Sequence, residues 1–262
     1  MKSTQLTETT RTVKRGRPEV FILKPQYLKQ VNVSNMLLEY FYKLKVMEQR
    51  ILHALIANIH MNHNKFYPCS ITISDFLRAC NLEDGGVQRT AVERAAVSVL
   101  ERVVHIPHPG EKTMHIQWVS KVITESSQAT ISLELNESLS PYLLQLKHSF
   151  TSMPFNTLVS FKSMHTIKIY MALKKHMGIN KVAMRKEGVL TIKVKALRRL
   201  LGYTDTEMQS ISSVKEKALQ VAFEELNTKS DIKILSITDN KDGRTITSMT
   251  ITYYRRAAAI GV

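Results

Sequence analysis

Hydrophobic side chains recur along the chain at two different spacings, which predict helices and strands in a definite order. The first half is expected to contain, in order, a helix near 35–62 after a Ser34 cap, a strand at 71–73, a short helix capped by Ser74, a helix near 88–102, strands near 103–107 and 113–119 around Pro109-Gly110, a third strand and a final short helix.

The second half is expected to repeat this order. It contains a helix that ends at Gly178, a strand at 190–192, a short helix closed by Gly202, a helix near 207–228 and two strands around the turn "DNKDGR". Arg50-Ile51 aligns with Lys168-Ile169 at an offset of 118, Ile71 with Leu190 at 119, and Val92 with Val214 at 122.

Helix, strand, helix, turn, helix and hairpin together make a winged helix, a helix-turn-helix followed by a β-wing. The sequence therefore predicts an α+β fold of two tandem winged-helix domains that arose by internal duplication. The stretch Ser149–Pro154 is the expected joint. We expect a disordered basic arm over 1–18, a first domain over 19–148 and a second domain over 149–262.

The positive charge is concentrated in two regions of the 262-residue chain, whose formal net charge is +15. Residues 1–18 carry five basic and one acidic side chain, residues 19–145 carry twelve of each, and residues 146–262 carry twenty basic and nine acidic side chains. Because solubility alone would not require this distribution, the second domain and the arm are expected to face a polyanion.

The segment "SSVKEKALQVAFEELN" has the apolar spacing of an amphipathic helix, with Ile211, Val214, Ala218, Val221, Ala222 and Leu226 on one side. Its lysines lie in the N-terminal half and Glu224 and Glu225 lie near the C-terminus, which is the reverse of what the helix dipole favours. This helix occupies the third-helix position of the second unit, which in winged helices usually enters the major groove. Its lysines are therefore expected to face DNA.

The second half resembles the Rep_3 family of plasmid replication initiators. The resemblance rests on the stretch from Ser163 to Tyr170, on "LRRLLG" (197–202), on the helix positions from Val214 to Asn227 and on the "SDI" that follows. It covers about 150–255 well and 33–145 more loosely. Two departures stand out: aliphatic Met208, Ile211 and Val214 replace aromatic residues, and Lys217 replaces an arginine. Lysine lacks the bidentate fork that reads guanine, so Lys217 reads a base or holds only a phosphate.

The resemblance implies binding to repeated duplex sites, called iterons, at a plasmid origin. It also implies a first domain that mediates dimerisation, a monomer that activates replication, a dimer that represses, and recruitment of the host initiator and helicase. These expectations come from the family and not from the residues themselves.

The candidate DNA contacts fall into five groups. They are the third helix of the second unit (Ser212, Ser213, Lys215, Lys217), the start of the preceding helix (Lys193, Lys195), the first helix of that unit (Lys162, Ser163, Lys168), the wing tip (Lys241, Arg244) and the corresponding places of the first unit (Arg89, Thr90, Arg94, Lys112). The alternative for each is a solvated surface side chain.

The arm contains "KRGRP", which resembles an AT-hook core. Gly16 permits an extended chain deep in a narrow minor groove, and Arg15 and Arg17 would follow its negative potential. The alternative is a basic tail that adds only phosphate contacts.

No catalytic or metal-binding pattern is evident in the sequence. The histidines around "HIPHPGEKTMH" lack a carboxylate cluster, no GxxxxGK[ST] loop occurs, and Cys69 and Cys80 have no zinc spacing, so both are expected to be reduced and buried. We expect no cofactor, no metal and no enzymatic activity. No apolar run is long enough for a membrane span and no export signal is present, which favours the bacterial cytoplasm.

Three functions remain open. The leading hypothesis is a sequence-specific initiator of plasmid replication that also represses its own gene as a dimer. The second is a tandem winged-helix transcription regulator that acts only at an operator. The third is a nicking or strand-joining enzyme.

Overall fold

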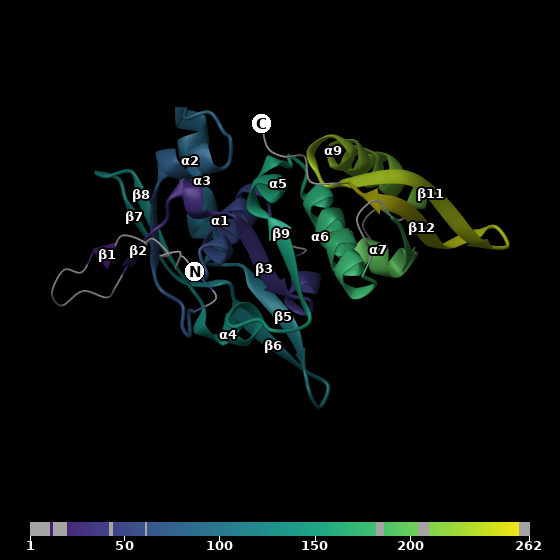
Figure 1. Ribbon diagram of the computed structural model, residues 1–262, viewed down its shortest axis with the longest axis horizontal. Helices are drawn as coiled ribbons and strands as arrows, with labels where there is room; N and C mark the ends of the chain where they lie inside the picture. Colours follow the sequence, from purple (N-terminus) through teal and green to yellow (C-terminus); the bar gives the residue numbers. More distant parts are fainter. Residues whose placement is uncertain are drawn as a thin grey trace, which may run out of the picture.

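The computed structural model describes residues 11–12, 20–41, 44–60, 62–181, 186–203 and 210–256, and it contains two units of the same architecture (Figure 1). The first unit consists of α1 (Val46–Ala57), β4 (Cys69–Thr72), α2 (Ile73–Ala79), α3 (Gly86–Val99), β7 (Val119–Glu125) and β8 (Thr130–Leu135). The second consists of α6 (Met164–Ile179), β10 (Glu187–Lys193), α7 (Val194–Leu201), α8 (Ile211–Val214), η4 (Lys215–Gln220), α9 (Val221–Lys229), β11 (Ile232–Asp242) and β12 (Thr245–Arg255).

The strand registers show that the two units are copies of one fold. In the first unit β4 pairs antiparallel with β8, with Ile71 opposite Ile131. In the second unit β10 pairs antiparallel with β12, with Ile192 opposite Met249. The pairs Cys69–Leu133 and Leu190–Ile251 correspond in the same way. The predicted duplication and the predicted winged-helix fold are therefore confirmed, with offsets of 121 for the first strand and 118 for the last. The predicted pairing of Ile71 with Leu190 at 119 is wrong by two residues, because Ile71 corresponds to Ile192.

The third helices also correspond, but at a different offset from the one predicted. The buried positions of α3 are Val92, Ala95, Ala96 and Val99, and those of η4 and α9 are Leu219, Ala222, Phe223 and Leu226. Each lies 127 residues after its counterpart. The predicted pairing of Val92 with Val214 is wrong because six more residues separate corresponding positions of the second and third helices in the second unit than in the first.

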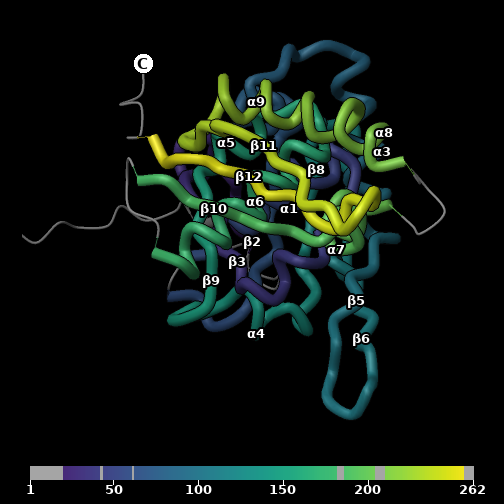
Figure 2. The backbone as a smooth tube through the Cα atoms, turned by 90° about the vertical axis from the view of Figure 1, so that its right-hand side faces the viewer, coloured from purple at the N-terminus to yellow at the C-terminus, as the bar shows by residue number. Residues whose placement is uncertain are grey.

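The hairpin predicted as the first wing is an insertion. β5 (Val103–His108) and β6 (Lys112–Gln117) pair only with each other among the described strands, and the hairpin protrudes from the first unit (Figures 1 and 2). The counterpart of the β11–β12 wing is the β7–β8 hairpin, because β8 pairs with β4. Lys112 therefore lies on a hairpin that has no counterpart in the second unit.

Three predicted helix boundaries differ from the structure. The stretch 35–62 forms the short 3-10 helix η2 (Leu37–Tyr40) and then α1, whose start is fixed by a hydrogen bond from Lys45 N to Glu48 Oε2. The cap of α2 is Thr72, whose hydroxyl accepts from Asp75 N at 3.0 Å, and not Ser74. Gly178 lies inside α6, which ends at Ile179.

The expected joint between the units is a paired strand. Residues Phe150–Pro154 form β9, which pairs antiparallel with β3 (Gln30–Ser34) of the first half. Arg50 of α1 also donates hydrogen bonds to the carbonyl oxygens of Val159 and Phe161 across the boundary. The strand pairing and these hydrogen bonds therefore connect the two units.

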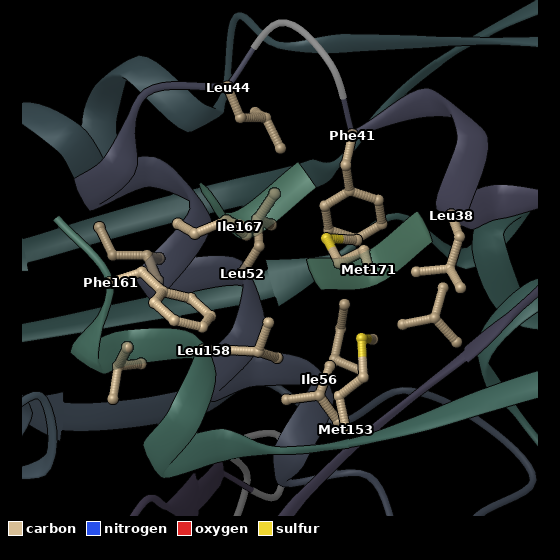
Figure 3. Packing of buried hydrophobic residues seen from close by; sticks show 14 of the residues in the cluster. Leu38, Phe41, Leu44, Leu52, Ile56, Met153, Leu158, Phe161, Ile167 and Met171 are labelled. Atoms are coloured by element: carbon tan, nitrogen blue, oxygen red, sulfur yellow. The ribbon is translucent and has the colours of Figure 1, made fainter. Parts of the chain in front are cut away.

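The buried side chains form one continuous cluster through both units. Figure 3 shows Leu52 and Ile56 of α1 close to Leu158, Ile167 and Met171 from the second half of the chain. A shared core of this kind fixes the orientation of one unit on the other.

The remaining described elements support the first unit. They are β1 (Arg11–Thr12), β2 (Val20–Ile22), η1 (Pro25–Tyr27), η3 (Glu137–Leu139), α4 (Ser140–Leu143) and α5 (Phe155–Ser160). The first unit's sheet has the order β1-β2-β4-β8-β7, so Arg11 and Thr12 of the predicted disordered arm pair with β2. Cys69 and Cys80 are buried free thiols, as expected. Among the described residues, no helix has both the length and the apolar character that a membrane span requires.

Candidate nucleic-acid interface

The N-terminus of α7 has no side-chain cap. Its cap residue is Lys193, which makes no side-chain capping bond, and the first turn contains no acidic residue. Lys195 lies exposed in that turn. The first backbone N–H groups of a helix need acceptors and carry the positive end of its dipole, so this end, flanked by two lysines, favours a phosphate.

The corresponding end in the first unit is closed. There the cap is Thr72, whose hydroxyl accepts from the backbone N–H of Asp75, and the Asp75 side chain adds a negative charge in the first turn. The same fold position is therefore satisfied within the protein in one unit and open to an external anion in the other.

The third helix of the second unit contains a π-helical segment, η4, between α8 and α9. An i→i+5 turn inserts a residue and is frequent at functional sites. Val214, Ala218, Ala222 and Leu226 are buried as predicted, together with Leu219 and Phe223. The prediction that Val221 packs in the core is wrong, because its side chain is 43% exposed, like that of its counterpart Arg94 on α3.

The outer side of this helix carries the predicted contacts and two that the sequence pattern missed. Ser212 and Lys217 are exposed, and Ser213 is half-buried. Gln220 and Val221 are also exposed on this helix. A glutamine can read adenine and an apolar side chain can contact a thymine methyl group, so both are further candidates for groove contact.

Lys215 connects the third helix to the wing. Its ammonium group forms an ion pair with Asp239 of β11. This contact positions the wing relative to the helix, and a contact of Lys215 with phosphate stays a prediction. At the wing tip, Lys241 and Arg244 are both exposed around the turn at Gly243, whose φ of 58° suits glycine.

One predicted contact is wrong. Lys168 is only 2% exposed, and its Nζ donates to the carbonyl oxygen of Leu201 at 2.9 Å. Burial lowers the pKa of its amine to about 8. Lys168 connects α6 to the end of α7 and cannot reach a phosphate.

The start of α6 already binds a carboxylate of the protein. Glu225 of α9 accepts hydrogen bonds from the backbone N–H groups of Lys162 and Ser163 and from the Thr166 hydroxyl, at 2.9, 3.1 and 2.7 Å. Burial raises the pKa of Glu225, but the hydrogen bonds from Lys229 and from the start of α6 outweigh it and lower the pKa overall. The Ser163 hydroxyl accepts from His165 N, and the Lys162 side chain is exposed. DNA contact by these two residues stays a prediction.

The predicted contacts of the first unit are less available than those of the second. Arg89 is held by Asp84 and Ser74, and the Thr90 hydroxyl donates to the carbonyl oxygen of Gly86. Arg94 is exposed on α3, and Lys112 is exposed on the inserted hairpin. Arg15 and Arg17 of the arm lie outside the described residues.

Figure 2 shows how the elements that carry these groups are arranged. The start of the α8–α9 helix, the tip of the β11–β12 hairpin and α7 all lie toward the right-hand side of that view. Within the described part of the chain, no group of three or more His, Cys, Asp or Glu side chains could hold a metal ion.

Two tandem winged helices, of which one presents cations and an open helix end on its surface, define a DNA-binding protein. Residues 30–174 match the model "Initiator Replication protein, WH1", and residues 193–253 match "Initiator Rep protein, WH2". The chain therefore belongs to the initiator replication protein family. These matches place α6 with the first winged helix, whereas the repeat of elements places it at the start of the second.

A solved structure shares the fold. The Pi initiator protein, solved in complex with iteron DNA, superposes with a TM-score of 0.75 at 14% identity and covers 87% of this chain and 98% of its own. The match to the RctB domains 2-3 has a TM-score of 0.45 at 13% identity and covers 81% of this chain and 83% of that chain. The match to the MSBI1.176 WH1 domain has a TM-score of 0.32 at 20% identity and covers 41% of this chain and 86% of that chain. Both similarities are weak. Among curated proteins, none matches the sequence.

Proposed function

We propose that the protein initiates plasmid replication by binding iterons, repeated duplex sites at the origin, chiefly through its second unit. The observation that carries this proposal is the uncapped N-terminus of α7 between Lys193 and Lys195, on the same unit as an exposed third-helix face and a cationic wing tip. Family membership and the likeness to the Pi initiator, which was solved with iteron DNA, support it.

The proposed contacts divide into two kinds. Lys193, Lys195, Lys241 and Arg244 hold phosphates, which positions the protein without reading sequence. Ser212, Lys217, Gln220 and Val221 read base edges in the major groove. The protein acts by binding and deforming DNA, without a covalent step, and works in the bacterial cytoplasm.

Further partners follow from the family resemblance and belong to this proposal. A second copy of the chain would bind the first unit and form the repressing dimer. The host initiator and helicase would join once the neighbouring A·T-rich DNA has opened.

Footprinting on plasmid origin DNA tests the initiator function. Protection of several direct repeats about two helical turns apart, next to an A·T-rich stretch, is the expected result. Protection of a single inverted repeat upstream of a promoter would indicate a transcription regulator instead. The supercoiled DNA should remain unnicked in the presence of Mg²⁺ or Mn²⁺, and a tyrosyl–DNA adduct would overturn the proposal of a non-enzymatic mechanism.

A further inference from the structure

A cavity of about 530 Å³ opens where η2 of the first unit meets α6, β10 and α7 of the second. Its apolar lining includes Leu38, Phe41, Met171, Ile179, Leu190 and Leu200. Small-molecule sites commonly measure about 300–1,000 Å³ and combine apolar walls with a few convergent polar groups. The cavity has the size and the walls of such a site.

The charged groups that line the cavity are mostly cationic. Lys193, Lys195 and Arg199 lie on β10 and α7, and all three are exposed. Glu39 is the one acidic residue among the described lining side chains, and it is already paired with Lys175. The lining therefore has a surplus of positive charge at its α7 side.

The buried amine of Lys168 also lines the cavity. Its ammonium group donates to the carbonyl oxygen of Leu201, at the C-terminal end of α7, so it is already paired within the protein. The N-terminus of α7 lies at the other end of this helix, beside Lys193 and Lys195, and adds the positive end of a helix dipole there. An anionic group is therefore favoured at the side of the cavity formed by Lys193, Lys195 and the first turn of α7.

We propose that this cavity binds a small anionic amphiphile, a molecule with an apolar body and one acidic head group. The apolar body would replace water against Leu38, Phe41 and Met171, and the head would lie near Arg199 and the start of α7. DNA itself does not fit the apolar walls, and the volume suits a small molecule better than a protein helix.

Occupancy of the cavity should weaken DNA binding, and this part of the inference rests on the proposed function. Lys193 and Lys195 are lining residues of the cavity and proposed phosphate contacts at once. An acidic head group that neutralises them would remove phosphate contacts, and by reciprocity bound DNA would weaken the amphiphile.

Fluorescence titration of the full chain with 1-anilinonaphthalene-8-sulfonate tests the site directly. We expect saturable enhancement from one site per chain, displaced by dodecanoate but not by equal concentrations of dodecanol or dodecyltrimethylammonium. Absence of saturable enhancement, or equal displacement by all three compounds, would overturn the proposal.

Two variants and a control localise the binding. Ala196→Leu places a larger side chain at an exposed lining position and should abolish the enhancement. Arg199→Ala should weaken the probe about threefold to fivefold, as expected for an exposed ion pair. Lys233→Ala removes an exposed cation on β11 outside the cavity and should leave the affinity unchanged. Wild-type binding by both lining variants would show that the probe binds elsewhere.

The effect of cavity occupancy on DNA binding is measured separately. Saturating dodecanoate should weaken the affinity of the wild-type protein for an iteron duplex severalfold and leave that of Ala196→Leu unchanged. An equal loss in both proteins, or no loss in the wild type, would overturn the coupling. A protein that binds the probe but no duplex would instead contradict the proposed function, so the two failures are distinguishable.

Discussion

In both units a carboxylate and a hydroxyl group join the first helix to the third, but the two groups have exchanged places. In the first unit the carboxylate is Glu48 on α1, which accepts from the Ser98 hydroxyl of α3 at 2.7 Å. In the second unit the carboxylate is Glu225 on α9, which accepts from the Thr166 hydroxyl of α6 at 2.7 Å. Thr166 lies 118 residues after Glu48, and Glu225 lies 127 residues after Ser98, the offsets at which these helices correspond.

Both units therefore have a charge-assisted hydrogen bond between the first and third helices, and either helix can supply the charge. It also accounts for the position of Glu225. A carboxylate in the last turns of its own helix is unfavourable for that helix's dipole, but this one lies at the positive end of α6.

The surfaces of the two units differ more than their folds. Lys193 occupies the place of Thr72 as the cap of the second helix, and Lys217 occupies the place of Thr90 on the third. Lys241 and Arg244 lie at the wing tip of the second unit, whereas the corresponding β7–β8 turn of the first unit begins after the acidic Glu125. Each of these differences makes the second unit more positive without altering the buried positions. The same fold therefore has a neutral surface in one unit and a cationic surface in the other.

The largest effect is expected at the hydrogen bond between the carboxylate and the hydroxyl group that joins the first helix to the third. Glu225→Thr removes the acceptor for two backbone N–H groups and one hydroxyl, and should lower the free energy of unfolding by about 3 kcal/mol. Adding Thr166→Glu should restore at least half of this loss, because a glutamate three residues after the Ser163 cap completes a capping box and can accept from a threonine at 225. Urea denaturation of the two variants measures both effects. A double variant no more stable than the single one would contradict the equivalence of the two carboxylate–hydroxyl contacts.

The next effect concerns sequence reading by the third helix. Lys217→Ala should cost about 1–3 kcal/mol of binding to the iteron and relax preference at one base position if the lysine reads a base. The corresponding substitution in the first unit, Thr90→Ala, should change affinity far less. Competition titrations with single-base variants of the repeat would show the difference, and equal losses from the two substitutions would contradict the division of roles.

A buried histidine distinguishes the cores of the two units. Both ring nitrogens of His53 are buried without a hydrogen-bond partner among the described residues, and burial lowers its pKa to about 3. The corresponding residue in the second unit, 118 positions later, is buried Met171. Because the unfolded chain takes up a proton below pH 6.5 and the folded protein does so only near pH 3, the free energy of unfolding should fall by about 1 kcal/mol from pH 7 to pH 5.5 on account of His53.

His53→Met tests this assignment by giving the first unit the residue of the second. The variant should be at least as stable as the wild type at pH 7 and lose less stability at pH 5.5, as measured by urea denaturation at both values. An unchanged pH dependence would show that His53 is not the group responsible.

The smallest effect concerns a single phosphate contact. Lys195→Ala should reduce affinity for all duplex sequences alike and lower the slope of log affinity against log salt by about one. Lys112→Ala on the inserted hairpin serves as the matched control and should leave the slope unchanged. A change in sequence preference for Lys195→Ala would indicate a base contact instead.

The repeated order of elements could be predicted because periodicity and turn residues are local properties of the sequence. The pairing of β8 with β4 could not, since nothing in the residues of β5 and β6 indicates that their hairpin is an insertion. The π-helical turn could not be predicted either, because a 3.6-residue wheel assumes regular spacing.

For the candidate site, too, local features of the sequence could be predicted and contacts between distant segments could not. Residue type and position indicated Lys193, Lys195 and Lys217, which the structure places on exposed positions. Residue type alone could not reveal that Lys168 is buried beneath α7 or that Lys215 pairs with Asp239, since both depend on contacts between distant segments.

The most direct test compares charge reversal in the two units on one iteron duplex at physiological salt. Lys195→Glu and Arg94→Glu each reverse one exposed cation, the first at the start of α7 and the second on α3. If the second unit carries the main DNA contact, Lys195→Glu should weaken binding at least tenfold and Arg94→Glu less than about threefold, a difference of roughly 1 kcal/mol. Equal losses, or a larger loss from Arg94→Glu, would contradict this account.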